Sequence, residues 1–539
     1  MTTQLELADI QGNILTAYGK LGFPHGRFLL LHVDKPQAGR TFVELLRRRV
    51  TTALRWPSDR KPNPPGKIYQ RRPEVALNIS FTFWGLLALQ VPIRTLRGLP
   101  DEFIDGMAAR ADILCDNFPR PIKESWDPVW NVDGGSDGAV HILVTLNAQM
   151  NADGTPVAAL EDITREISAL CDATEGGVRL LHGHRNPDPA WQDLSALMAT
   201  QPDGTRQPLP TEHFGFVDAI GDPVFEGQKP DEPNAAIGQG KLLADQSWVP
   251  LATGEFLLGH PDESQEIACA AMPLDFSRNG TFVAYRKLHQ NVAAWNASMA
   301  KLAQQFAAVM DVPEAEAEET LKAKMAGRWR DGTTLIAAPD FATWQALREK
   351  RLAAEKANDH ATLAALNRAL VDFTFVDDQT GAKCPIGAHL RRANTRDMLD
   401  PHLTSANKAE RNGSVLNNRR RILRRGLPYG AHDGGADDSG EHGIVLLATC
   451  ANLFRQFEFV QQQWMQYGLD FNAGNDTCPI VGNHGAEAKF VIPADPASGK
   501  PPFFCGGLPQ FVETRGGEYF FTPSLTALRM IATGVVDPT

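Results

Sequence analysis

The sequence predicts an α+β fold built from two related halves, and three observations support this prediction. First, apolar segments of strand length alternate with segments of helical periodicity along the chain. Second, at 539 residues the chain is too long for one simple core, so two domains are expected. Third, the first half follows the order β, β, α, β, α, β, which is close to the split βαβ pattern of ferredoxin-like domains. We therefore expect two ferredoxin-like domains with antiparallel sheets and peripheral helices.

The first domain is predicted to span residues 1–225. Its apolar runs predict strands over residues 26–33, 76–89, 139–146 and 178–185. Helices are predicted over 101–114 and over 160–174, because Leu160, Ile163 and Ile167 recur at helical spacing in the second of these segments. A polar loop over 201–210 leads towards the domain boundary.

The second domain, residues 226–539, is predicted to repeat this pattern with longer insertions. Its predicted strands cover residues 281–288 and 443–450, and its predicted helices cover 291–310 and 452–464. The last helix has an apolar face, with Asn452 as its N-cap, made of Leu453, Phe457, Val460 and Trp464. The Ala-, Leu-, Lys- and Glu-rich segment 343–370 predicts an inserted helical hairpin, and 432–443 predicts a polar loop.

The composition is typical of a soluble globular protein. Hydrophobic residues make up 43% of the chain, charged residues make up 22%, and the net charge is −11. This acidic balance argues against wholesale binding to nucleic acid or to an anionic membrane. We find no signal peptide and no apolar run of membrane-spanning length. The seven cysteines form no Cys-x-x-Cys pair, which favours a reducing cytoplasm over a disulfide framework or a zinc ribbon.

Two short stretches carry candidate functional residues. In "HFGFVDAIGDP" (213–223), glycines on both sides of Asp218 suggest tight or left-handed backbone geometry. This aspartate either bonds its own backbone in a turn or performs chemistry. In "CPIGAHLRRANTRD" (384–397), His389 lies among small and apolar residues. Taken singly, it is either a structural donor or a metal ligand.

The segment "NNRRRILRRG" (417–426) contains five arginines between residues 419 and 425. Three interpretations compete for this run. It could be a solvated basic edge, a contact with nucleic acid, or a pocket for an anion whose carboxylates or phosphates match guanidinium groups. The acidic total charge and the lack of interleaved aromatic residues argue against nucleic acid.

Seven ordered stretches become informative when they are taken together. They are "DIQGNIL" (9–15), "HFGFVDAIGDP", "NGTFVAYRKLHQ" (279–290), "KMAGRWRDGT" (324–333), "CPIGAHLRRANTRD", "RRILRRGLPYG" (420–430) and "GIVLLATCANLFRQFEFVQ" (443–461). This series closely resembles the dye-decolorizing peroxidases, a family of haem b enzymes with two ferredoxin-like domains, and is most similar to their longer, non-exported subgroup. The resemblance covers residue 9 to about residue 530, and the hairpin around 343–370 has no counterpart in it.

The resemblance implies roles for individual residues. His389 matches the axial ligand of the haem iron, and a single protein ligand leaves the opposite face of the iron open. Asp218 matches the distal aspartate, a base and then an acid towards hydrogen peroxide. Arg424 matches the distal arginine, which stabilises developing charge, whereas Arg425 would point away if this segment is extended. The haem pocket is therefore expected mainly in the C-terminal domain, with the N-terminal domain supplying Asp218.

The same resemblance suggests roles for four further residues. Ile444 and Leu446 would form the apolar distal wall, with leucine where an aromatic residue is common. Asn452 stands where many relatives place a carboxylate that accepts a hydrogen bond from the axial histidine, although it could simply cap the following helix. Ala219 stands where the family usually has glycine, and it would displace Asp218 if a positive φ is required there.

We therefore predict a cytoplasmic haem b peroxidase that reduces hydrogen peroxide to water and oxidises small organic donors, such as dyes and phenolics, by one-electron steps. One alternative is a haem-binding protein with low turnover, motivated by Ala219 and Asn452, and another is a nucleic-acid-binding protein. Trp329, Tyr429 and Trp464 are either core residues or relays for electrons from large donors. We expect no nucleic-acid or membrane partner, and the oligomeric state stays open.

Overall fold

The N-terminal half has the sheet order of a ferredoxin-like domain. The computed structural model describes residues 4–58, 63, 66–218, 220–267, 271–431, 437–495 and 498–536. In this half, antiparallel strands lie in the order β4-β1-β3-β2, namely β4 (Val178–Leu180), β1 (His25–Val33), β3 (Ile142–Ala148) and β2 (Val75–Phe81). Helix α2 (Pro36–Arg47) follows β1 and helix α7 (Ala159–Asp172) follows β3, so the predicted split βαβ pattern is formed.

The C-terminal half repeats this order. Its strands lie in the order β11-β12-β10-β15, namely β11 (Leu423–Tyr429), β12 (Gly443–Cys450), β10 (Thr281–Gln290) and β15 (Val512–Thr522). When the strands of each half are numbered along the chain, this order is 2-3-1-4. The N-terminal half has the same order when it is read from β2 to β4. Every pair in this half is antiparallel, as predicted.

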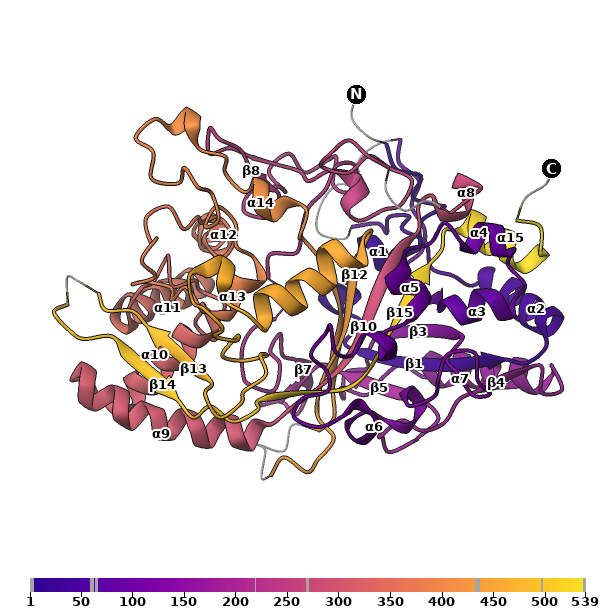
Figure 1. The fold of residues 1–539 in the computed structure, drawn as a ribbon, viewed down its shortest axis with the longest axis horizontal. Helices are drawn as coiled ribbons and strands as arrows, with labels where there is room; N and C mark the ends of the chain where they lie inside the picture. The colour runs from indigo at the N-terminus through magenta and orange to yellow at the C-terminus, as the bar shows by residue number, and fades with distance from the viewer. Residues whose placement is uncertain are drawn as a thin grey trace.

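The two halves join edge to edge through one pair of strands. Phe521 of β15 lies opposite Phe81 of β2, so the described residues form a continuous nine-stranded sheet, in which β5 (Gln192–Ser195) also pairs with β1. Figure 1 shows the N-terminal half with α2 at one end of the molecule and helices α9–α12 at the other. A single apolar cluster contains residues of both halves, including the contacting rings of Phe28 and Tyr285.

The remaining elements surround this sheet. The longer helices are α9 (Val292–Met310), α10 (Glu314–Ala326), α11 (Phe341–Lys356), α12 (His360–Ala369) and α15 (Leu525–Thr533). Short helices are α1 (Gly12–Leu15), α3 (Phe83–Ala88), α4 (Ile93–Leu96), α5 (Asp101–Asp105), α6 (Ile122–Ser125), α8 (Leu274–Ser277), α13 (His389–Ala393) and α14 (Val415–Asn418). Small hairpins join β6 (Met198–Thr200) to β7 (Arg206–Pro208), β8 (Lys241–Leu242) to β9 (Trp248–Val249), and β13 (Lys489–Ile492) to β14 (Phe503–Gly506).

The predicted hairpin at 343–370 is confirmed as α11 and α12. The side chain of Asp340 accepts a hydrogen bond from the Thr343 backbone N–H, and the side chain of Asp359 does the same for Thr362. Such N-caps satisfy backbone donors that a helix leaves free at its start. In the part of the chain that the structure describes, no helix has both the length and the apolar character needed to cross a membrane.

Several local predictions were wrong in extent. The strand predicted over 76–89 ends at Phe81, because Thr82 caps a new helix by accepting a hydrogen bond from Gly85 N–H. The helix predicted over 101–114 stops at Asp105, because Gly106 takes a φ of 78°. The strand predicted over 178–185 covers only 178–180. The predicted loop over 201–210 contains strand β7, and residues 432–436 of the predicted loop 432–443 lie outside the described residues.

Candidate active site

One face of the C-terminal sheet forms the wall of a large cavity. The cavity has a volume of about 900 Å³, within the range of cofactor and ligand sites. Alternate residues of neighbouring strands line it, as expected when one face of a sheet is exposed to a cavity. They include Arg424, Gly426 and Pro428 of β11, Ile444, Leu446 and Ala448 of β12, and Arg286, Leu288 and Gln290 of β10. Three intervening residues, Arg425, Leu427 and Leu447, also reach the cavity. The predicted wall residues Ile444 and Leu446 therefore lie on this face.

Asp218 and Arg424 come together at this cavity. A guanidinium Nη1 of Arg424 lies 3.5 Å from Oδ1 of Asp218, and both residues line the cavity. The other Nη of Arg424 donates to the Ile220 carbonyl over 2.9 Å, and its backbone N–H donates to Asp222 over 3.1 Å. β11 is thereby held against the loop that carries Asp218. The predicted distal pair is thus close enough to act on one ligand.

Glu212 organises the loop in front of Asp218. Its carboxylate accepts hydrogen bonds from the backbone N–H groups of Phe214 and Phe216, over 2.8 and 2.9 Å, and from the side chain of Gln290. Gly215 completes this turn with a φ of 89°, a backbone conformation that glycine adopts more readily than other residues. Burial raises the pKa of Glu212 to about 7, although these hydrogen bonds lower it, and the nearby charge of Asp218 raises it further.

The five arginines of the run 419–425 have separate environments. Arg419 pairs with Asp262 over 3.0 Å, and Arg420 stacks over the ring of Phe459. Arg425 pairs with Asp222 over 2.5 Å and is buried, while Arg424 faces Asp218. Arg421 donates to the carbonyls of Gly240 and Gln239 and lines the cavity. The run is therefore not a solvated basic edge, because each of its five side chains has a bonded or stacked partner, and Arg421 and Arg425 are buried.

Arg328, Arg396 and Arg421 form a basic cluster at the cavity, in which Arg396 and Arg421 are buried. Their guanidinium groups donate to backbone carbonyls, and within the described ranges none of the three is paired with a carboxylate in an ion pair. Burial lowers the pKa of Arg328 and of Arg421 to about 10, and it lowers the pKa of Arg396, which also feels the charges of Arg421 and Arg328. The buried Nε of Arg396 has no hydrogen-bond partner. Clustered positive charges of this kind favour an anionic ligand.

His389 lies at the first position of helix α13 and lines the same cavity. Its Nδ1 atom is 3.2 Å from the sulfur of Cys478, so Nε2 is the nitrogen left for a metal. Burial by itself would raise the pKa of the Cys478 thiol, but the His389 ring, its hydrogen bond and the charge of Arg392 outweigh burial and hold the pKa below its usual value.

Asn452 caps the helix that follows β12. Its side-chain oxygen accepts a hydrogen bond from the backbone N–H of Arg455 over 2.8 Å, and it is absent from the described residues that line the cavity. The structure thus supports the interpretation of Asn452 as a helix cap, and a role toward His389 stays a prediction.

The helix predicted over 452–464 forms with a different hydrogen-bond pattern. It consists of two π-helical segments, η6 (Leu453–Glu458) and η7 (Val460–Met465), in which hydrogen bonds join residues five apart. Phe457, Gln461 and Met465 line the cavity from this helix. Such π-helical turns are frequent at functional sites.

The residues present fit a haem group. The cavity combines apolar walls with a histidine whose Nε2 is available and with buried arginines that have no carboxylate partners among the described residues. An iron porphyrin needs an apolar slot, an axial nitrogen ligand and cations for its propionates. Sequence reasoning missed Arg328, Arg396 and Cys478, because nothing in a linear sequence marks an arginine as facing a cavity or a thiol as facing a histidine.

Other candidate residues are accounted for in the core. Trp329, Tyr429 and Trp464 are all buried, which supports the interpretation that they are core residues. Trp329 also lines the cavity and stacks on Trp344 with ring centroids 4.6 Å apart. The predicted effect of Ala219 lies outside the described residues.

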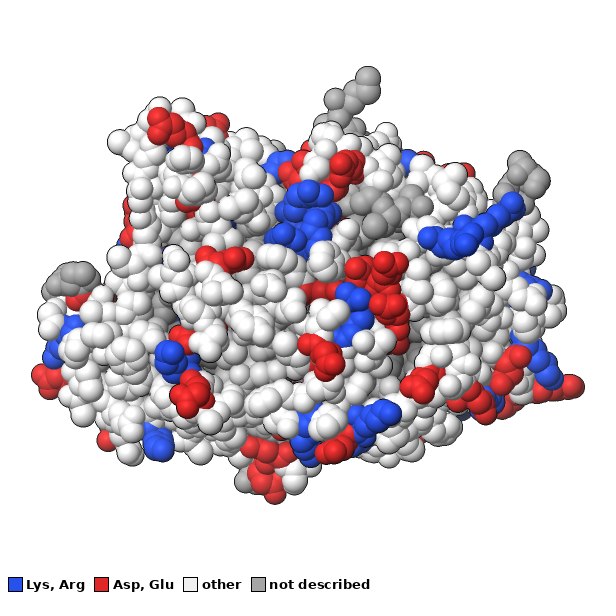
Figure 2. All heavy atoms as spheres, in the orientation of Figure 1, with Lys and Arg blue, Asp and Glu red and all other residues white. Residues whose placement is uncertain are grey.

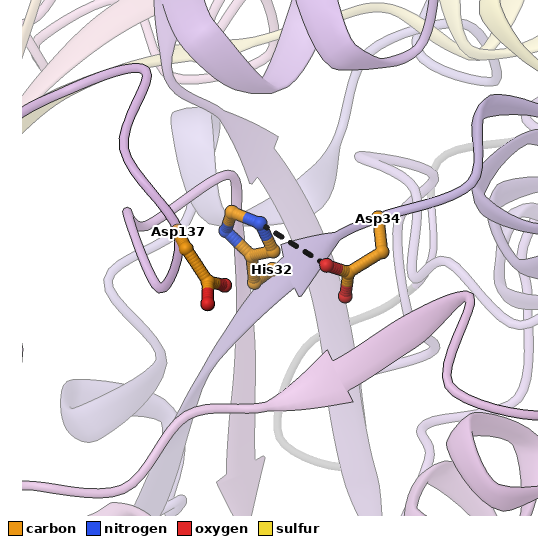
Figure 3. A group of neighbouring side chains, drawn as sticks. All are labelled: His32, Asp34 and Asp137. Atoms are coloured by element: carbon orange, nitrogen blue, oxygen red, sulfur yellow. Dashed lines mark ion pairs between the residues drawn. The ribbon is translucent and has the colours of Figure 1, made fainter.

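A second cluster of ligand-type side chains lies at the end of β1. His32, Asp34 and Asp137 approach one another there, with His32 and Asp34 paired over 3.7 Å (Figure 3). Arg179 donates to the carboxylates of both Asp34 and Asp137, and Nδ1 of His32 bonds the Ala139 carbonyl over 2.7 Å. The guanidinium group already pairs with both acids, so the cluster is an ion-pair network.

The known proteins that this chain matches are all named as peroxidases. The chain is 30% identical to peroxidase 2 of Mycetinis scorodonius over 477 residues, which are 85% of this chain and 76% of that protein. It is 24% identical to a dye-decolorizing peroxidase of Auricularia auricula-judae over 538 residues, 98% of this chain and 87% of that protein. A solved dye-decolorizing peroxidase in complex with cyanide, 24% identical, superimposes with a TM-score of 0.70 over 98% of this chain and 100% of that one. No family model matches the chain.

Proposed function

The chain belongs to the dye-decolorizing peroxidases, and on this premise we propose that it holds haem b in the cavity, with His389 as axial ligand and with Asp218 and Arg424 as the catalytic pair. Membership of this family makes the chain a haem peroxidase that oxidises organic donors such as dyes and phenolics with hydrogen peroxide. The main support for this site is that His389, Asp218 and Arg424 line one cavity although they come from three separate segments.

Haem, when bound, supplies the iron at which the O–O bond of hydrogen peroxide is broken and the oxidising equivalents that organic donors later reduce. Asp218, in its ionised form, accepts a proton from the inner oxygen of hydrogen peroxide and delivers it to the outer oxygen, which leaves as water. Its side chain is half exposed to the cavity, so small ligands and water can reach it.

Arg424 contributes positive charge and hydrogen-bond donors where negative charge develops on oxygen. Because its second Nη is anchored to the Ile220 carbonyl, the guanidinium group is oriented before a ligand arrives. Preorganised donors of this kind lower the barrier without reorganising during the reaction.

The basic cluster of Arg328, Arg396 and Arg421 would hold the propionates, and Ile444 and Leu446 would pack against the macrocycle. The type of haem is part of this proposal: the sequence has no Cys-x-x-Cys-His attachment motif, which favours the non-covalent b type. The cytoplasmic location and the boundary at residues 225/226 stay predictions, and the oligomeric state stays open.

The two alternatives differ in how well they fit. A haem-binding protein with low turnover would use the same cavity, and it is favoured only if Ala219 displaces Asp218. Nucleic-acid binding would need a continuous basic surface. Figure 2 shows small basic groups interspersed with acidic ones on the face drawn, and Arg421 and Arg425 of the arginine run are buried.

The test is an absorption spectrum of the haem-loaded protein before and after one equivalent of hydrogen peroxide, for wild type and His389→Ala. A Soret band that shifts with peroxide in wild type, and whose position changes or whose haem is lost in the variant, supports the proposal. A band that depends on His389 but ignores peroxide would favour the low-turnover alternative. Absence of any haem band would overturn the proposal.

A further inference from the structure

We infer that Cys478 is the positioning residue of the axial ligand: its sulfur accepts a hydrogen bond from Nδ1–H of His389 when Nε2 binds iron. This inference rests on the proposed function. The supporting geometry is the distance of 3.2 Å between Nδ1 and the sulfur, in a pair whose members are 89 residues apart in the chain.

The backbone of Cys478 is fixed from several sides. Its N–H donates to the Met465 carbonyl at the end of η7 over 2.7 Å, and its carbonyl accepts from Gly482 N–H over 3.0 Å. The ring of His484 also contacts this carbonyl through Nε2, at 3.0 Å. The sulfur is thus presented to His389 by a rigid loop, not by a freely rotating surface side chain.

Arg392 joins the segments that converge on this pair. Its buried guanidinium donates to the carbonyls of Gly387, Trp464 and Asp476, over 2.9 Å in each case. These carbonyls belong to the segment before His389, to η7 and to the loop before Cys478. A buried arginine with several carbonyl partners fixes the relative position of these segments, and so it fixes the distance between the imidazole and the sulfur.

Ligation determines the direction of the hydrogen bond. A neutral imidazole that binds a metal through Nε2 carries its proton on Nδ1, so Nδ1 must donate and the sulfur must accept. The sulfur of Cys478 has lone pairs that can accept this hydrogen bond.

A hydrogen-bond acceptor at Nδ1 changes the reduction potential of the iron through the imidazole ring. Electron density given to the Nδ1–H bond raises the basicity of Nε2, strengthens the iron–nitrogen bond and lowers the reduction potential of the iron. Sulfur is a weaker acceptor than a carboxylate, and an alanine provides none. We therefore expect the iron–histidine bond to be strongest in Cys478→Asp, intermediate in wild type and weakest in Cys478→Ala.

The experiment measures the iron–histidine stretching band by resonance Raman spectroscopy, and the reduction potential, on haem-loaded wild type, Cys478→Ala, Cys478→Ser and Cys478→Asp. We expect the band to move to lower frequency and the potential to rise in Cys478→Ala, with both shifts reversed in Cys478→Asp. Cys478→Ser, whose hydroxyl oxygen is a stronger acceptor than a thiol sulfur, is expected between wild type and Cys478→Asp. If the alanine variant does not fold, the order of wild type, Cys478→Ser and Cys478→Asp still tests the inference.

Cys505→Ala is the matched control, because Cys505 is a buried cysteine of the same apolar cluster and makes no hydrogen bond to His389. Its band and potential should equal those of wild type. A wild-type band that stays unchanged in the three Cys478 variants would overturn this inference and leave the axial role of His389 intact. A wild-type protein without an iron–histidine band would overturn the axial role itself, and this inference with it.

Discussion

The guanidinium group of Arg424 lies 3.5 Å from the carboxylate of Asp218, although the two residues are 206 positions apart in the chain. One side chain comes from the regular strand β11 and the other from a loop held by Glu212. The pair therefore combines a rigid element with a separately anchored turn, which places a base and a cation at one end of the cavity.

Asp218→Asn is expected to slow the reaction with hydrogen peroxide by a factor on the order of 10²–10⁴, because an amide cannot accept the proton. The rate is read by stopped-flow absorption at the Soret band over a range of peroxide concentrations. Haem content should stay at the wild-type level, since Asp218 is not assigned to holding the cofactor.

Asp203→Asn is the control for that change. Asp203 is a turn aspartate that accepts hydrogen bonds from Thr205, as most turn aspartates accept from neighbouring backbone. Its variant should react at the wild-type rate. If Asp218→Asn reacted just as fast, the catalytic base would have to be another group, and Glu212 is a buried carboxyl at the same cavity.

Arg421→Gln is expected to release haem at least about tenfold faster than wild type, which corresponds to about 1.4 kcal/mol of lost binding. The reason is that Arg421 belongs to the basic cluster that faces the cavity. Haem transfer to an excess of apomyoglobin measures the rate. Arg419→Gln is the matched comparison, because Arg419 lies in the same run but pairs with Asp262. Equal rates for the two variants would contradict the propionate role.

The stability of the apoprotein is expected to fall between about pH 5 and pH 8 through Glu212. Burial raises the pKa of Glu212 from 4.5 to about 7 in the folded state, so the folded protein binds more protons than the unfolded chain in this window. Stability therefore decreases as pH rises, by up to about 3 kcal/mol. Urea unfolding at several pH values measures the slope.

Glu212→Gln should remove most of this slope, because the amide has no proton to lose. The comparison variant is Glu487→Gln at an exposed position, which should keep the wild-type slope. An unchanged slope in Glu212→Gln would show that other groups dominate the pH dependence.

Lys287→Met is expected to destabilise the protein by about 3–5 kcal/mol, because it leaves the buried carboxylate of Asp127 with only the longer ion pair to Arg185, over 3.9 Å. Lys287 of β10 and Asp127 of the N-terminal half form an ion pair over 2.7 Å, and both side chains are 0% exposed. The double variant Lys287→Met/Asp127→Asn should recover a large part of the loss, measured by urea unfolding. A single variant as stable as wild type would contradict the importance of this ion pair.

Much of the fold could be predicted from local pattern. Strand β1 and helix α7 formed close to their predicted limits, because an unbroken apolar run or a regular apolar spacing records which face is buried. The segment 76–89 was misread, since its apolar residues are equally compatible with strand and helix, and only the capping bond of Thr82 to Gly85 decides between them. The π-helical form of 453–465 was likewise not predictable, because burial of an apolar face does not define the hydrogen-bond spacing.

The sequence by itself determined the family, the ferredoxin-like order of each half and the candidates Asp218, His389 and Arg424, because these depend on motifs and on order along the chain. Only the tertiary structure decided that the two sheets join through Phe521 and Phe81 and that His389 lies against Cys478. Contacts between distant segments arise from the way loops and helices pack over the sheet. Side-chain direction at a cavity is a property of that packing, which no local stretch of sequence records.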